Sequence, residues 1–120
     1  MRPYGYESDR HTIRPSEAEV LRESANRVLD GESLRSVARN INDAGARTVS
    51  GKQWDAKLLR RVLASPRVAG KRISRDGKVR RADWPAILDD AVVGAQAREL
   101  FADAREMMDR IVAEKWLTAR

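Results

Sequence analysis

The chain has 120 residues, 42% of them hydrophobic and 35% charged, and a net charge of +6, which fits one folded domain rather than a disordered chain. It contains no cysteine and a single histidine, His11, which excludes a disulfide framework and a thiolate or multi-histidine metal site, and we expect no cofactor. No apolar run reaches the about 20 residues of a membrane helix, and residues 1–6 lack a signal peptide's apolar core, so we expect a cytoplasmic protein.

The first part of the chain predicts a hairpin followed by a helix. Residues 3–14 place apolar residues on either side of a polar turn, which favours a short hairpin. The helix is expected to begin at Ser16, because Ser16 and Glu19 have the spacing of a capping box and Pro15 lies just outside it. Gly31 is its expected end. The apolar residues are Tyr4, Tyr6 and Ile13 in the hairpin and Val20, Leu21, Ala25, Val28 and Leu29 in the helix.

Two further helices are predicted in the middle of the chain. One begins at the N-cap residue Ser33 and ends at Gly45, and the other, residues 55–65, is capped by Asp55 and ends before a proline. Residues 46–54 connect them as two short extended pieces around a Ser-Gly turn. The apolar faces comprise Leu34, Val37, Ala38 and Ile41 in the first helix and Leu58, Leu59, Val62 and Leu63 in the second.

A second hairpin is predicted after the third helix. Residues 68–74 and 78–84 have the composition of strands, and the Asp76-Gly77 pair between them is a strong signal for a tight turn. Pro85 ends the second strand.

A long helical pattern closes the chain. Asp89 or Asp90 caps it, and its apolar residues recur as far as Trp116. An unbroken helix would be roughly 40 Å long, more than a compact domain of this size needs, so it either bends near residues 102–103 or projects. We therefore divide the chain into a main domain at residues 1–102 and a helical extension at residues 103–120, which either packs back on the domain or pairs with a second copy.

Basic side chains are concentrated in residues 52–81. That segment holds eleven basic and two acidic residues, a net charge of +9, whereas residues 1–51 are neutral and residues 82–120 carry −3. Clustered like charges repel one another and destabilise a compact state. The segment therefore favours a polyanionic partner over the alternative of an ordinary basic surface.

The helix predicted at residues 55–65 combines an apolar face with a basic one. At about 100° per residue, Lys57, Arg60, Arg61 and Ala64 fall opposite the apolar side chains. Cations at this spacing repel by a few tenths of a kcal/mol per pair in solvent, but against DNA each can meet a phosphate or a guanine edge. The pattern alone favours a solvated face and a DNA-binding face equally, and the basic hairpin beside it favours DNA.

These elements predict a mostly α-helical fold with short β-hairpins, of helix-turn-helix or winged-helix type. The connection between the two helices is longer than the usual tight turn, and the basic hairpin would serve as the wing. RNA remains an alternative on charge, but few aromatic residues are present for stacking on bases, and Trp54 and Trp84 are expected in the core. The hairpin cations are assigned to phosphates. The residues expected to contact double-stranded DNA are Ser50, Lys52, Lys57, Arg60, Arg61, Arg67, Lys71, Arg72, Arg75, Lys78, Arg80 and Arg81.

Several segments together resemble the recombinase domain of large serine recombinases, the phage-type serine integrases. Residues 29–39 read LDGESLRSVAR, residues 51–54 read GKQW, and residues 59–70 read LRRVLASPRVAG. The Trp-Pro-Ala-Ile motif with its acidic helix start follows at residues 84–90, and an aromatic-Gly-Tyr segment opens the domain at residues 2–6. The resemblance implies a non-catalytic domain that binds recombination attachment sites, in a recombinase encoded by a bacterium or phage.

The resemblance also implies which chemistry to expect elsewhere. Enzymes of this family carry a separate catalytic domain with a nucleophilic serine, whereas the serines here have positions typical of caps, turns and helix faces, and Ser16 and Ser33 are interpreted as N-caps. We therefore expect this chain to be a DNA-binding part without catalytic activity of its own. The alternatives are an intact recombinase, a DNA-binding transcriptional regulator, and an interaction module that dimerises through the C-terminal helix.

Overall fold

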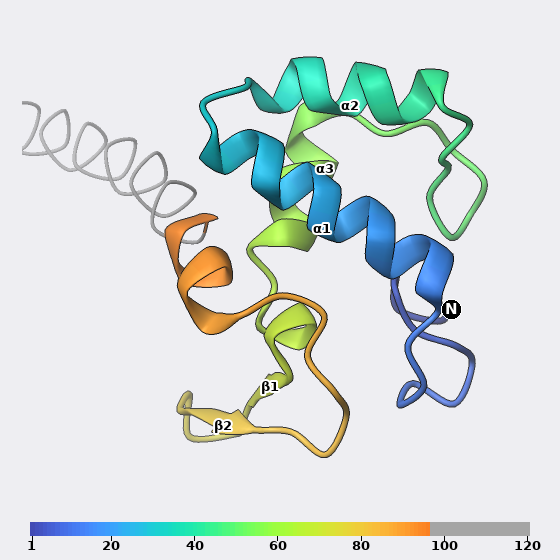
Figure 1. Cartoon of the computed structure of the whole chain (residues 1–120). Coiled ribbons are helices and arrows are strands. Elements are labelled where there is room, and N and C mark those ends of the chain that lie inside the picture. Colours follow the sequence, from blue (N-terminus) through green and yellow to red (C-terminus); the bar gives the residue numbers. More distant parts are fainter. Residues whose placement is uncertain (97–120) are drawn as a thin grey trace, which may run out of the picture.

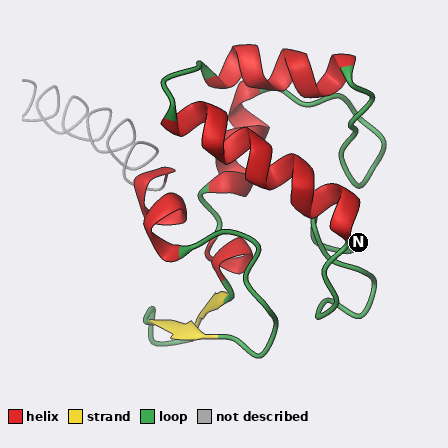
Figure 2. Ribbon diagram, in the orientation of Figure 1, coloured by secondary structure: helices red, strands yellow, loops and turns green. Residues whose placement is uncertain are grey.

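The computed structural model describes residues 1–96 and shows a mostly α-helical fold with a small two-stranded sheet at one end (Figures 1 and 2). The prediction of a mostly α-helical chain with a short hairpin is therefore confirmed. None of the helices in this part of the chain is long and apolar enough to cross a membrane. The elements are α1 (Pro15–Leu29), α2 (Leu34–Asp43), α3 (Ala56–Leu63), the 3-10 helix η1 (Pro66–Ala69), β1 (Lys71–Ile73) and β2 (Val79–Arg81).

The N-cap of helix α1 lies two residues before the predicted one. Pro15 occupies its first turn and Arg14 is the N-cap, with no side-chain hydrogen bond to the helix, so the assignment of Ser16 as N-cap is wrong. The fixed φ of proline suits the first helical position, and its missing N–H would have had no partner there. The predicted end at Gly31 is confirmed by its φ of +100° directly after the C-cap Asp30.

Both predicted caps of α2 and α3 are confirmed. The Ser33 hydroxyl accepts a hydrogen bond from the Ser36 N–H at 3.1 Å, and the Asp55 carboxylate accepts one from the Leu58 N–H at 2.7 Å. These bonds satisfy helix N–H groups that have no partner within the helix. Gly45, with a φ of +94°, follows the C-cap of α2 as expected.

The connection between α2 and α3 is held by one side chain rather than by extended pieces. The Asn42 amide donates to the Trp54 carbonyl and accepts from the Trp54 N–H, both at 2.8 Å. Residues 46–54 form no strand, and the predicted Ser-Gly turn is present, with the Thr48 N–H bonded to the Lys52 carbonyl at 2.9 Å. Trp54 is 4% exposed, so its prediction as a core residue is confirmed. Asn42 and Trp54 therefore determine where α3 begins relative to α2.

The second hairpin is shorter than predicted. Strands β1 and β2 cover three residues each, because Pro66 starts η1 and Gly70 ends it with a left-handed φ of +70°. A side chain at Gly70 would come within 3.3 Å of Ala86, so this position also permits the close return of the chain after β2. Residues 82–88 then pair with η1 by single hydrogen bonds instead of continuing a strand, such as Ile87 N–H to the Val68 carbonyl at 2.8 Å.

The predicted short N-terminal hairpin is confirmed, with an antiparallel bridge between Tyr6 and Ile13 and hydrogen bonds from the Glu7 N–H to the Thr12 carbonyl and from the Arg14 N–H to the Gly5 carbonyl, both at 2.8 Å. Tyr6 is fully buried, and its hydroxyl donates to the Pro85 carbonyl at 2.7 Å. This bond connects the N-terminal segment to the chain that follows β2. The first hairpin and its anchoring residues are thus correct, and tertiary contacts attach it to the rest of the fold.

The last described segment starts a further helix. The Asp89 carboxylate accepts a hydrogen bond from the Val92 N–H at 2.9 Å, which selects Asp89 from the two predicted caps, and residues 90–96 are helical. The predicted extension at residues 103–120 lies outside the described residues.

One hydrophobic core joins these elements. The α1, α2 and α3 helices each bury one face in it, and residues after β2 close it from the other end. Its most deeply buried side chains include Tyr6, Leu21, Val37, Leu59 and Leu63. Full burial of aliphatic side chains of this size contributes about 1.5–3 kcal/mol each.

Glu17 gives the fold a testable pH dependence. Its carboxylate accepts hydrogen bonds from Arg2 at 2.5 and 2.7 Å and from the Gly5 N–H at 2.8 Å. Burial alone would raise the pKa of Glu17, but these hydrogen bonds lower it below its usual value. We expect Glu17→Gln to reduce the free energy of unfolding by about 2 kcal/mol at neutral pH, whereas Glu19→Gln, on the exposed side of α1, should change it by less than about 0.5 kcal/mol.

Urea denaturation at two pH values checks this expectation. A carboxyl whose pKa is lowered by folding contributes stability above its unfolded pKa, and the contribution is lost as the pH falls through the folded value. The difference in the free energy of unfolding between the parent chain and Glu17→Gln should therefore become smaller between pH 7 and about pH 3. An equal difference at both values would contradict the role of the Glu17 charge.

Candidate nucleic-acid interface

Helix α3 turns its basic residues away from the core. It buries Leu59 and Leu63 completely and leaves Lys57 and Arg61 exposed. Two details differ from the predicted face. Arg60 is partly buried, and Ala64 is only 9% exposed because the chain turns there toward η1. The outward basic face of α3 therefore consists mainly of Lys57 and Arg61.

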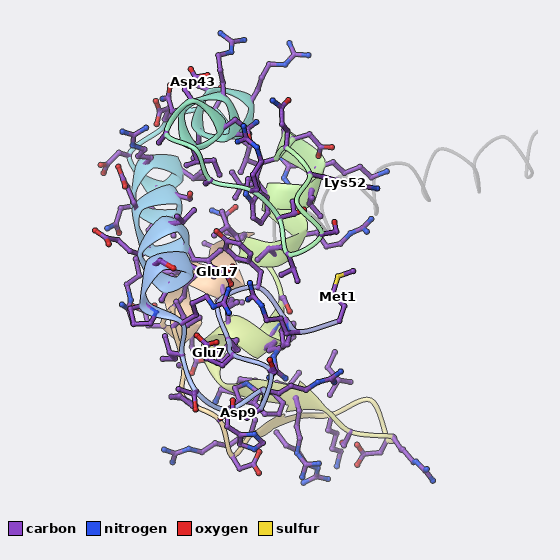
Figure 3. The ribbon with its side chains drawn as sticks, turned by 90° about the vertical axis from the view of Figure 1, so that its right-hand side faces the viewer. Met1, Glu7, Asp9, Glu17, Asp43 and Lys52 are labelled. Carbon is purple, nitrogen blue, oxygen red and sulfur yellow. The ribbon has the colours of Figure 1, made fainter. Side chains whose placement is uncertain are left out.

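The loop before α3 adds Ser50 and Lys52, and both are exposed. The Thr48 hydroxyl organises this turn, since it lies 3.2 Å from the Ser50 hydroxyl and accepts a hydrogen bond from the Lys52 N–H at 3.0 Å. In Figure 3, the loop that carries Lys52 and the β1–β2 hairpin extend toward the same side of the molecule, and α1 lies on the opposite side. Helix α3 lies on the side of the loop and hairpin.

The β1–β2 hairpin places like charges directly opposite one another. Lys71 pairs with Arg81 and Arg72 pairs with Arg80 in the antiparallel register. Like charges at facing positions destabilise a sheet. Two acids relieve part of this repulsion, because Arg80 forms an ion pair with Asp76 at 3.0 Å and Lys71 forms one with Asp90 at 3.5 Å. The hairpin cations that form no ion pair with another described residue are Arg72, Arg75, Lys78 and Arg81.

Arg67 makes more contacts within the fold than the exposed cations of α3. Its guanidinium lies over the rings of Trp84, at 4.1 Å, and Tyr6, at 4.8 Å, and it donates to the Arg10 carbonyl. Burial lowers the pKa of Arg67. Trp84, half-buried, donates from its Nε1 to the Arg67 carbonyl at 3.0 Å. The structure thus engages Arg67 in packing between segments of the fold.

A concave surface between α2 and α3 holds basic residues that the sequence analysis missed. Arg35 and Arg39 are exposed one turn apart on α2, and they line this surface together with Lys57 of α3. Arg60 joins Arg35 and Lys57 at one end of it. The apolar face of α2 was predicted correctly, so plotting its outer face on the same helical wheel would have revealed the two arginines.

Within residues 1–96, no group of three or more acidic, histidine or cysteine side chains is placed to hold a metal ion. His11 instead interacts with the Asp9 carbonyl at 2.8 Å and the Asp83 carboxylate at 3.3 Å, and these contacts raise its pKa. His11 thus connects the N-terminal loop to the segment after β2.

A comparison with family models matches residues 15–110 to the family described as Recombinase, which covers most of the chain. The chain belongs to the Recombinase family. The family relationship expected from the sequence motifs is therefore confirmed, and it implies a role in site-specific DNA recombination. The comparison with solved structures found no match.

The two arginines Arg67 and Arg61 of this recombinase domain should behave differently on substitution. Arg67→Ala removes a guanidinium that contacts two rings, so we expect the free energy of unfolding to fall by about 2 kcal/mol. Arg61→Ala removes an exposed charge and should change it by less than about 0.5 kcal/mol. Urea denaturation measures the free energy of unfolding of both variants. Equal values for Arg67→Ala and Arg61→Ala would show that Arg67 does not support the fold.

Proposed function

We propose that this recombinase-family chain binds duplex DNA at recombination attachment sites, as a DNA-binding part of a serine recombinase. The observation that carries the proposal is the common orientation of its basic elements. Helix α3, the loop containing Lys52 and the β1–β2 hairpin lie on one side of the molecule, with α1 on the other (Figure 3). A duplex carries phosphates on both borders of its grooves, so an extended basic face suits it better than a small anionic ligand.

Charge distribution supports the same proposal. Residues 52–81 carry a net charge of +9, and they form α3, η1 and the hairpin. Helix α1, on the other side, mixes acidic and basic residues and uses some of them in pairs within the helix, such as Glu23 with Arg27 at 3.3 Å. A face with a clear excess of one sign attracts a polyanion and orients it before contact.

Within this proposal α3 enters a groove as the recognition helix. Helices α2 and α3 follow the order of a helix-turn-helix, with the longer connection at residues 44–55 fastened by Asn42. The hairpin serves as a wing along the phosphates. Arg35 and Arg39 on α2 extend the phosphate contacts beyond the residues expected from the sequence.

The proposed role is binding rather than strand cleavage. Several serines of the described part have structural partners: Ser33 and Ser65 cap helices, and Ser74 accepts a hydrogen bond from Arg80. These partners support the interpretation of the serines as structural residues. The proposed self-association concerns residues 103–120, which lie outside the described part.

Removing the outward charges of α3 tests the role of this helix. We expect the double variant Lys57→Gln and Arg61→Gln to weaken binding to an attachment-site duplex at least tenfold, because each lost contact to a phosphate or base edge costs about 1–3 kcal/mol. Fluorescence anisotropy measures the affinity. The control Arg22→Gln and Arg27→Gln removes the same charge from α1 and should have a much smaller effect. Equal losses in the two double variants would remove α3 from the interface.

The cations of the β1–β2 hairpin should determine how strongly the DNA affinity depends on salt concentration. We expect the triple variant Arg72→Gln, Arg75→Gln and Lys78→Gln to reduce the slope of log affinity against log salt concentration by about 2 to 3, since each phosphate contact contributes about 0.9. The preference for an attachment-site duplex over a scrambled duplex should change little. An unchanged slope would contradict the assignment of these residues to phosphates.

A further inference from the structure

The β1–β2 hairpin exposes an apolar pair among its cations. Ile73 and Val79 face each other in the register and are 62% and 60% exposed. Facing residues of an antiparallel pair project to the same side of the sheet. The two β-branched side chains therefore form one apolar patch, which the described part of the chain leaves largely uncovered.

Cations surround this patch on both strands. Side chains alternate along a strand, so Lys71 and Arg81 share the face of Ile73 and Val79, and the Arg72–Arg80 pair projects from the other face. Beyond the patch, the turn residues Arg75 and Lys78 continue the basic surface. A partner that covers this hairpin must therefore present apolar groups next to negative charge.

The major groove of duplex DNA has this arrangement. Phosphates border it on both sides, and its floor exposes the 5-methyl group of each thymine. The groove is about 12 Å wide and admits a two-stranded β-ribbon, whereas the minor groove is only about 6 Å wide. The deep, narrow major groove of an RNA helix admits no such ribbon. The charge of the hairpin thus favours a duplex, and its apolar pair favours the major-groove side of that duplex.

We propose that Ile73 and Val79 contact thymine methyl groups in the major groove while the neighbouring cations bind the bordering phosphates. This inference rests on the proposed DNA-binding function and adds to it a specificity-determining contact. It makes the hairpin a reader of base sequence at T-containing positions as well as a phosphate-binding wing.

A cycle of protein and DNA changes tests the contact. The full chain and the double variant Ile73→Thr and Val79→Thr are each titrated against a short mixed-sequence duplex, made once with thymine and once with deoxyuridine, which lacks the methyl group. Threonine keeps the β-branched shape that suits a strand. We expect the parent chain to bind the thymine duplex roughly tenfold more tightly than the uracil duplex, since each buried methyl group contributes about fourfold. Threonine retains one methyl group on Cβ, so the variant should show a clearly smaller preference for the thymine duplex than the parent chain, with the same salt slope.

Leu29→Thr is the matched control, because Leu29 is also an exposed hydrophobic residue, at 52%, but lies at the end of α1 far from the hairpin (Figure 1). It should retain the full difference between the two duplexes. Thermal melting confirms that each variant is folded. Equal binding of both duplexes by the parent chain, or the same preference in the threonine variant, would overturn the inference.

Two further outcomes separate this inference from the function on which it rests. A parent chain that binds no duplex even at low salt contradicts the proposed function itself. Light scattering compares the mass of the threonine variant with that of the parent chain. A smaller mass for the variant, with DNA binding unchanged, would show that a second copy of the chain covers the patch, and it would overturn the thymine contact.

Discussion

The junction around Arg67 is the interaction on which the placement of the hairpin depends. The Arg67 carbonyl accepts a hydrogen bond from the Trp84 Nε1 and lies 3.2 Å from the Tyr6 hydroxyl, which donates to Pro85, and the guanidinium of Arg67 lies over both rings. Three segments distant in sequence therefore meet at one residue of η1. Because β1 starts directly after η1, this junction also sets the direction in which the basic hairpin leaves the core.

A second junction positions α3. Asn42, at the end of α2, forms two hydrogen bonds with the backbone of Trp54, one residue before the cap of α3. Trp54 is buried and contacts the Tyr4 ring edge to face at 4.8 Å between centroids. A flexible loop of this length would allow many positions of α3 relative to α2. The two hydrogen bonds from the Asn42 amide restrict the connection to a single arrangement. Helix α3 can thus present a fixed basic face although no tight turn joins it to α2.

These two junctions separate the residues that build the fold from those available for a partner. Arg2, Arg14 and Arg67 are engaged by carboxylates, carbonyls or rings, whereas Lys57, Arg61 and much of the hairpin face solvent. Because the chain belongs to the Recombinase family, we propose DNA as the partner of the second set. Within residues 52–81, burial therefore separates Arg67, which packs in the fold, from cations that remain exposed, such as Lys57 and Arg61.

The sequence by itself determined the helices, the caps at Ser33 and Asp55, the buried Trp54 and the family. Capping and helical periodicity are local, so residues a few positions apart contain the necessary information. The basic face of α3 and the basic hairpin were predictable for the same reason. Only the tertiary structure decided that η1 shortens the strands, that Arg67 packs between two rings, and that Arg35 and Arg39 lie beside Lys57. Each of these features depends on contacts between segments far apart in the chain, which no local pattern of residues specifies.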